Sequence, residues 1–195
     1  MRLISNVLGS RNHAKGTCLF VLICVWMYWY ITANSLTPEN VAFVLGEARL
    51  SFDSLKQFIM GNISHVEFRH LFFNMWLFLL TAPLVERGVG CINFLFICLM
   101  SAVGSVLGEF LVYGPEAGGY GASGVVYGVI GAFMVPRRFN MIWVFIATAS
   151  GILVAMETMS LAVPDNIGHA AHIGGFFGGF TTKCLLEIKR LRNRL

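Results

Sequence analysis

Long apolar runs, separated by short polar or glycine-rich connections, occupy most of this chain of 195 residues. Roughly 20 apolar residues are needed to cross a bilayer as a helix, and each run reaches or approaches that length. The pattern predicts six spans, near residues 17–34, 67–85, 91–113, 122–136, 140–158 and 169–186. We therefore expect an all-α membrane protein that forms a single domain over residues 1–195.

The composition supports this prediction. Hydrophobic residues make up 56% of the chain and charged residues 12%, with a mean hydropathy of +0.71. A soluble globular domain of this length would carry about twice that charged fraction. The lipid bilayer is therefore the expected environment, and little of the chain is left for a separate soluble domain.

The net charge of +4 does not indicate nucleic-acid binding, because the basic residues lie at the chain ends and in alternate loops. Cytoplasmic loops are rich in Lys and Arg, so this distribution predicts cytoplasmic termini, and we expect a bacterial inner membrane. We interpret the first apolar run, Cys18–Ala33, as a retained span, since no small-residue cleavage site follows it. The long outer connection, residues 35–66, mixes apolar and polar residues and is expected in the membrane interface.

The five cysteines lie within or beside apolar runs, and none forms a CxxC pair. This arrangement indicates packing residues rather than disulfides or metal ligands.

The first candidate for chemistry is Ser123, in the turn Gly121-Ala122-Ser123-Gly124 at the start of the fourth span. Flanking glycines allow a sharp turn and close approach of a substrate, and the Ser123 N–H can point toward a developing oxyanion. A serine that only packs helices is the alternative, because this motif alone is not specific.

The second candidate, His172, begins the last span at about the depth of Ser123. Its imidazole could take the serine proton and return it to a leaving amine. Tyr127, four residues after Ser123, is expected beneath His172, where it could stack on the ring. No acidic residue of the membrane interior is well placed to orient His172, so we expect a dyad rather than a triad; a histidine that only packs is the alternative.

His70 and Asn74 share one helical face and could complete an oxyanion hole, although a polar pair that only fixes helix packing is equally consistent. A metal site of His65, His70 and His169 is disfavoured, because His65 to His70 has HxExxH spacing instead of HExxH. We expect neither a metal nor a cofactor.

Small residues recur four positions apart on the later spans, which allows membrane helices to approach closely. The pairs are Gly104 and Gly108, Gly124 and Gly128, Gly174 and Gly178, and Gly175 and Gly179. Those that follow Ser123 and His172 are expected to bring the two candidate residues together.

Three motifs together resemble the rhomboid intramembrane serine proteases over nearly the whole chain. They are the HxxxxHxxxN spacing of His65, His70 and Asn74, the sequence Gly121-Ala122-Ser123-Gly124 with Tyr127, and Ala171-His172-Ile173-Gly174-Gly175. Glu86 with Gly90 looks like a further family element. One departure is Lys56-Gln57, at the position where members of this family commonly carry Trp-Arg.

The resemblance implies a six-helix rhomboid bundle in which Ser123 is the nucleophile and His172 the general base and acid. It further implies that His70, Asn74 and the Ser123 N–H hold the oxyanion, and that Tyr127 supports His172. His65 would be structural or would organise water. The fifth span and residues 161–168 would form the gate and cap through which a substrate helix enters.

We therefore expect an endopeptidase whose partners are transmembrane protein substrates and the bilayer, with no nucleic acid and no metal. Two other functions remain open. A non-catalytic rhomboid-like protein could bind membrane helices, and a small transporter could use His65, His70, His169 and Glu109 as a polar path.

Overall fold

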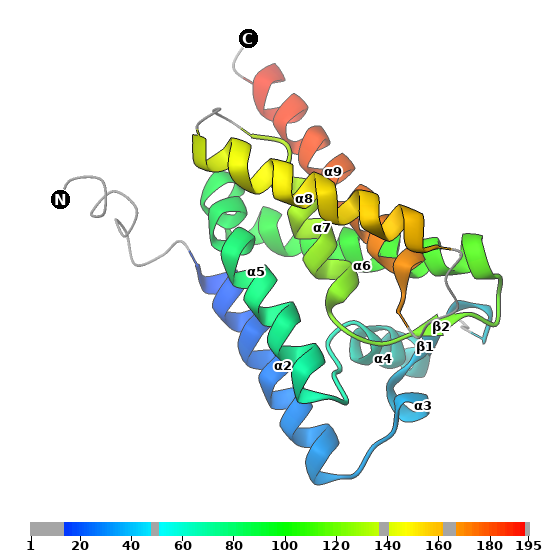
Figure 1. The fold of residues 1–195 in the computed structure, drawn as a ribbon. Coiled ribbons are helices and arrows are strands. Elements are labelled where there is room, and N and C mark those ends of the chain that lie inside the picture. Colours follow the sequence, from blue (N-terminus) through cyan, green and yellow to red (C-terminus); the bar gives the residue numbers. More distant parts are fainter. Residues whose placement is uncertain (1–13, 48–50, 137–140, 162–166, 194–195) are drawn as a thin grey trace.

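A computed structural model describes residues 14–47, 51–136, 141–161 and 167–193, and its elements are labelled as in Figure 1. The fold is built mainly from six long or apolar helices. These are α2 (Lys15–Ala33), α5 (Phe68–Val89), α6 (Cys91–Tyr113), α7 (Ser123–Phe133), α8 (Met141–Ser160) and α9 (His169–Arg192).

Small elements connect α2 to α5 and α6 to α7. They are α3 (Pro38–Val41), β1 (Phe43–Val44), the 3₁₀ helix η1 (Leu45–Glu47), α4 (Phe52–Gly61) and β2 (Gly118–Gly119). The two strands pair antiparallel, with Phe43 opposite Gly119 and Val44 opposite Gly118. This short ladder was not expected from the sequence, and it ties the connection between α2 and α5 to the loop that leads into Ser123.

All six predicted spans coincide with helices, but the count of six membrane crossings is not confirmed. In the described part of the chain, α2, α5, α6 and residues 143–160 of α8 are long and apolar enough to cross a membrane. The helix α7 is apolar but has only 11 residues. The last helix, α9, has 24 residues, but its final turns are strongly basic.

Helix ends explain most differences from the predicted ranges. The third range, 91–113, agrees with α6, whereas α5 continues past the expected residue 85 to Val89. It stops at Gly90, whose φ of 84° lies in the left-handed region that favours glycine. The helix α9 continues past residue 186 to Arg192, because Lys and Arg are good helix formers that hydrophobicity does not detect.

The helix α7 lies at the centre of the molecule, against α5, α6 and α9, while α8 crosses the outside (Figure 1). Val126, Val129 and Ile130 of α7 are fully or almost fully buried and pack in one cluster with Phe78 and Phe94. The N-terminal residue of α7, Ser123, is thereby held at the end of a rigid core helix.

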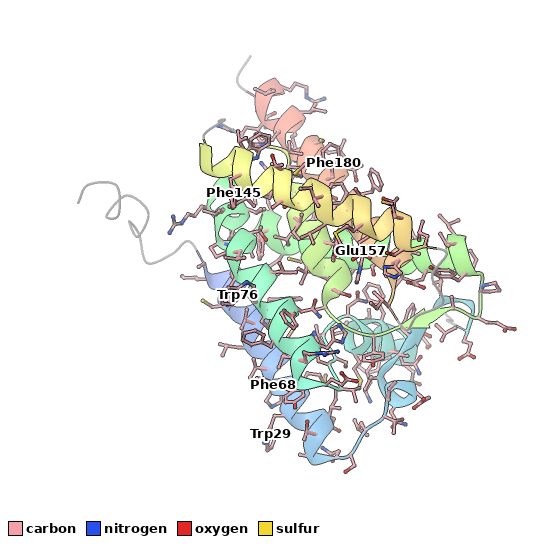
Figure 2. The ribbon with its side chains drawn as sticks, viewed as in Figure 1. Trp29, Phe68, Trp76, Phe145, Glu157 and Phe180 are labelled. Carbon is pink, nitrogen blue, oxygen red and sulfur yellow. The ribbon has the colours of Figure 1, made fainter. Side chains whose placement is uncertain are left out.

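Large apolar side chains cover the outer faces of the helices. Trp29, Trp76 and Phe145, from α2, α5 and α8, are more than half exposed (Figure 2). Such an apolar exterior is expected where the solvent is lipid rather than water.

The glycine pairs bring backbones into contact, as predicted. A methyl group on Gly104 would overlap the Gly174 carbonyl, and one on Gly179 would overlap the carbonyl of Gly128. The helix α9 therefore packs at backbone distance against both α6 and α7, which a larger side chain at these positions would prevent.

Glu86 fastens α2 to α5. Its carboxylate is buried and accepts hydrogen bonds from the backbone N–H groups of Gly16 and Thr17, each at 2.8 Å, and from the Thr17 hydroxyl at 2.7 Å. These N–H groups lie in the first turn of α2, where backbone donors have no partner within the helix. The family element identified in the sequence thus caps the first helix.

Candidate active site

The turn before Ser123 is built around Gly121. Its φ of 119° is one that residues with a side chain rarely adopt, and a Cβ there would lie 2.7 Å from Cε1 of His70. The Gly121 N–H donates to the Gly61 carbonyl at the end of α4, at 2.7 Å. Glycine is therefore required at this position, both by the backbone conformation and by the imidazole packed against it.

Ser123 is the first residue of α7 and is half-buried. The N–H groups of a first helical turn have no partner within the helix and carry the positive end of the helix dipole. The Ser123 backbone N–H is thus of the kind that can bind an oxyanion.

His172 lies one turn into α9 and is buried, with its ring stacked on Tyr127. The ring centroids are 4.3 Å apart and the planes differ by 3°. The predicted contact between Tyr127 and His172 is thereby confirmed. Among the described residues, no hydrogen bond joins the Ser123 hydroxyl to His172, so the dyad stays a prediction.

His65 connects the second span to the serine turn. It is fully buried, and its Nε2 lies 3.0 Å from the Asn74 side-chain nitrogen and 3.5 Å from the Ala122 N–H. Both groups can donate only if Nε2 carries no proton. Burial lowers the pKa of His65 to about 3, with the nearby His70 as a smaller cause. His65 therefore acts as a neutral acceptor for Asn74 and Ala122, which is more specific than the structural or water-organising role we expected.

His70 is half-buried beside the same turn. Its ring lies edge-on to those of His65 and Tyr120, at centroid distances of 5.0 and 6.1 Å. The structure thus gathers His65, His70 and Asn74 near Gly121 and Ala122, the residues that precede Ser123.

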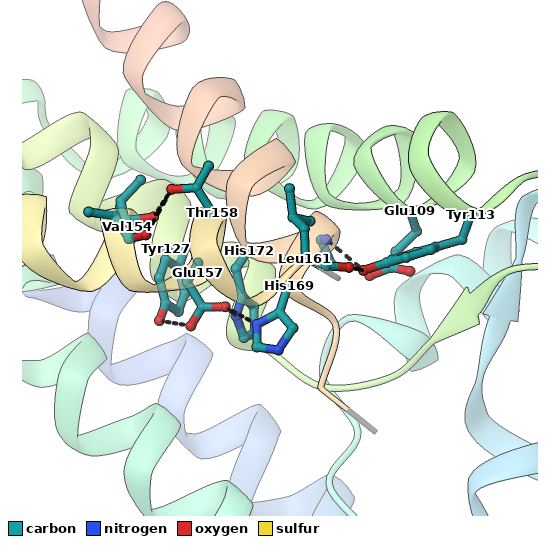
Figure 3. A network of polar contacts seen from close by, with 11 residues as sticks. Glu109, Tyr113, Tyr127, Val154, Glu157, Thr158, Leu161, His169 and His172 are labelled. Carbon is teal, nitrogen blue, oxygen red and sulfur yellow. Dashed lines mark hydrogen bonds and ion pairs between the residues drawn. The ribbon is translucent and has the colours of Figure 1, made fainter. Parts of the chain in front are cut away.

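The expectation that no acidic residue could orient His172 was wrong. Glu157, on α8, reaches the stacked pair: its Oε1 accepts from the Tyr127 hydroxyl at 2.5 Å, and its Oε2 lies 2.9 Å from Nδ1 of His172 (Figure 3). Nδ1 of His169 lies 2.5 Å from the same Oε2. Glu157 lies one residue before the predicted end of the fifth apolar run, residues 140–158, and only the packing of α8 on α9 brings it to His172.

Within the described residues, Glu157, His169 and His172 form one group whose ligand atoms lie close enough to hold a metal ion. The nitrogen-to-oxygen distances of 2.5 and 2.9 Å are those of direct polar contacts. Two ligands of one zinc ion would be separated by roughly 3.3 Å. The geometry therefore favours direct polar contacts among the three side chains, and the structure does not bring His65 or His70 into this group.

Glu109, which the alternative of a small transporter placed in a polar path, hydrogen-bonds to the backbone of α9. Its Oε1 accepts from the Ala171 N–H at 3.0 Å, near the start of α9 (Figure 3). This contact caps α9 immediately before His172.

The fold is that of a helical membrane protein, with a serine at the start of a central helix and a stacked histidine on the neighbouring helix. These features make the protein a candidate intramembrane serine hydrolase. A family model described as the Rhomboid domain matches residues 53–188, which include all of α4 but its first residue, α5 to α8 and most of α9. The chain belongs to the rhomboid family.

Relatives support this membership. The chain is 31% identical over 173 residues to "Putative rhomboid protease YdcA" of Bacillus subtilis, covering 86% of this chain and 85% of that protein. It is 25% identical to rhomboid protease GlpG of Haemophilus influenzae, over 90% of this chain and 92% of that protein. It is 23% identical to rhomboid-like protein 11, chloroplastic, of Arabidopsis thaliana, over 74% of this chain and 51% of that protein.

The family and the apolar helices together identify a multi-pass membrane protein of the hydrolase class that carries out intramembrane proteolysis.

Proposed function

We propose that this chain is an intramembrane serine endopeptidase that cleaves transmembrane segments of other membrane proteins through Ser123 and His172. The observation that carries the proposal is the placement of His172 against Tyr127, one helical turn from Ser123, on helices in backbone contact. A buried imidazole held flat beside the N-terminus of a serine-bearing helix is suited to proton transfer.

In the proposed reaction, Oγ of Ser123 attacks the carbonyl carbon of the scissile peptide, and its proton passes to Nε2 of His172. The oxyanion is held by the Ser123 N–H, His70 and Asn74. The C–N bond then breaks, His172 returns the proton to the leaving amine, and a water molecule hydrolyses the acyl-enzyme by the same proton route. No cofactor or metal takes part.

Substrates would enter past α8 and the segment 161–168, of which residues 162–166 lie outside the described part of the chain. The apolar window of α8 is 11% buried, against 28% to 39% for the other three candidate spans. A weakly packed helix beside the site is suited to lateral entry. We further propose cytoplasmic termini in a bacterial inner membrane, on the distribution of basic residues.

A substrate helix must unwind locally before attack, because its hydrogen bonds shield the scissile carbonyl. We therefore expect small or helix-breaking residues near the cleavage site and a small side chain immediately before it. Equal cleavage of an uninterrupted poly-leucine span and a span with alanine and glycine would contradict this substrate preference.

The test is cleavage of such a transmembrane substrate by the purified protein in proteoliposomes. Wild type should cut it, whereas Ser123→Ala and His172→Ala should each lose nearly all activity, by a factor of about a thousand or more. Ser101→Ala is a matched control, because Ser101 is a buried helix serine whose hydroxyl, within the described part of the chain, bonds only to the Ile97 carbonyl of its own helix. A folded wild type that binds the substrate without cutting it would favour the helix-binding alternative.

A further inference from the structure

Glu157 is an exception on its helix. It is the single charged residue of α8, and its side chain is only 14% exposed. A carboxylate in an apolar span is costly unless it is paired, and such residues face the interior for functional reasons. The three groups that surround Glu157 therefore indicate what it does.

Those groups come from two other helices. The Tyr127 hydroxyl of α7 donates to Oε1, while the Nδ1 atoms of His169 and His172 on α9 both lie against Oε2 (Figure 3). A carboxylate offers only acceptors, so each Nδ1 must carry hydrogen for these contacts to be favourable. In the neutral form of His172 the proton would then lie on Nδ1, which leaves a lone pair on Nε2.

That tautomer is the one the proposed reaction requires, because Nε2 must accept the Ser123 proton. Nδ1 of His172 lies 2.9 Å from Oε2 of Glu157, which is close enough for a strong polar interaction, but the angles are not those of a hydrogen bond. Hydrogen bonds between catalytic groups often tighten only when substrate binds. Tyr127 holds Oε1 of the carboxylate, and His169 shares Oε2 with His172, so the carboxylate stays close to His172.

Resting on the proposed function, we infer that Glu157 is a positioning residue for His172: its carboxylate selects the tautomer with hydrogen on Nδ1 and stabilises the imidazolium formed when Nε2 takes the Ser123 proton. The proton itself moves only from Oγ of Ser123 to Nε2 and then to the leaving amine. Glu157 accepts no proton and forms no bond to the substrate. The reaction centre is then a serine, a histidine and a glutamate from three different helices.

The inference is tested with Glu157→Leu, which removes the acceptor but suits an apolar helix, and with Glu157→Asp, which keeps the charge on a shorter side chain. Thr158→Ala is the matched control, because the exposed Thr158 hydroxyl bonds, among the residues that the structure describes, only to carbonyls of its own helix, those of Val154 and Ala155. Each protein is measured for kcat and KM on the transmembrane substrate in proteoliposomes. The histidine tautomers are read by ¹⁵N NMR in detergent, with His172→Ala identifying the signal.

We expect Glu157→Leu to lower kcat about 100-fold with KM changed less than about threefold, and Glu157→Asp to recover part of the loss. Thr158→Ala should stay within about twofold of wild type. The His172 signal should show hydrogen on Nδ1 in wild type and a mixture of tautomers in Glu157→Leu. Loss of kcat with an unchanged tautomer would overturn the inference, since Glu157 would then only hold α8 in place.

If the wild type is active and Glu157→Leu is equally active, the positioning role of Glu157 is overturned. The proposed roles of Ser123 and His172 would be unaffected by that result. Failure of the wild type to cleave would instead refute the proposed function, and the NMR measurement distinguishes the two cases because it does not depend on turnover.

Discussion

The ring of Tyr127 lies flat on the ring of His172, with centroids 4.3 Å apart, and its hydroxyl donates to Glu157 at 2.5 Å. One residue thus supports the imidazole in two separable ways. Tyr127→Phe keeps the stack and should lower kcat about threefold, the equivalent of one hydrogen bond. Tyr127→Ala removes both interactions and should lower kcat tenfold or more. Both variants would be compared by their kcat on the same transmembrane substrate. An equal loss of kcat in the two would show that the ring stack is unimportant.

Close helix contact predicts a sharp difference between two glycines. In Gly175→Ala the new methyl group would overlap the backbone of Gly124, and we expect a loss of about 1 to 3 kcal/mol in stability. Gly151→Ala on α8 meets no atom within 4 Å and should be neutral or stabilising by up to about 1 kcal/mol. Thermal unfolding in detergent measures both, and a stable, active Gly175→Ala would refute the backbone contact.

Glu86 should contribute to stability rather than to chemistry. Glu86→Ala leaves the first-turn donors of α2 without their acceptor, and we expect a loss of about 3 kcal/mol or more. The exposed Glu116 provides the comparison, because Glu116→Gln should unfold at the wild-type temperature. If both variants unfolded alike, the buried carboxylate would not be fastening α2.

His65 predicts a pH dependence of stability. Its folded-state pKa is about 3, against an ordinary value of 6.5, so between these values the unfolded chain binds a proton that the folded chain does not. This contribution should therefore lower stability as the pH falls below about 6.5, by at most about 1.4 kcal/mol per pH unit. His65→Gln should unfold with a shallower pH dependence between pH 7 and 4. An identical slope in the two proteins would mean that His65 is protonated in the folded state.

Much of this arrangement could be predicted from local sequence. Apolar length located the helices, and four-residue glycine spacing indicated which of them touch. The offset from Ser123 to Tyr127 correctly predicted the stack on His172, because residues four apart share a helix face. These features depend on neighbours along one helix.

Features that depend on how distant helices pack could not be predicted in this way. Glu157 lies 15 residues before His172 along the chain, and nothing in its local pattern shows that α8 turns it toward α9. The strand pair between Phe43 and Gly119 is equally non-local. The C-terminal turns of α5 and α9 were not predicted, because hydropathy detects the apolar part of a helix and not the charged residues that continue it.

The most direct test of the central claim is labelling of the folded protein in lipid by a fluorophosphonate probe, with the modified residue located by mass spectrometry. The account predicts adduct on Ser123 in wild type and in Ser101→Ala, and none in Ser123→Ala or His172→Ala. A folded wild type that takes up no probe, or labelling that persists on another serine in Ser123→Ala, would contradict it.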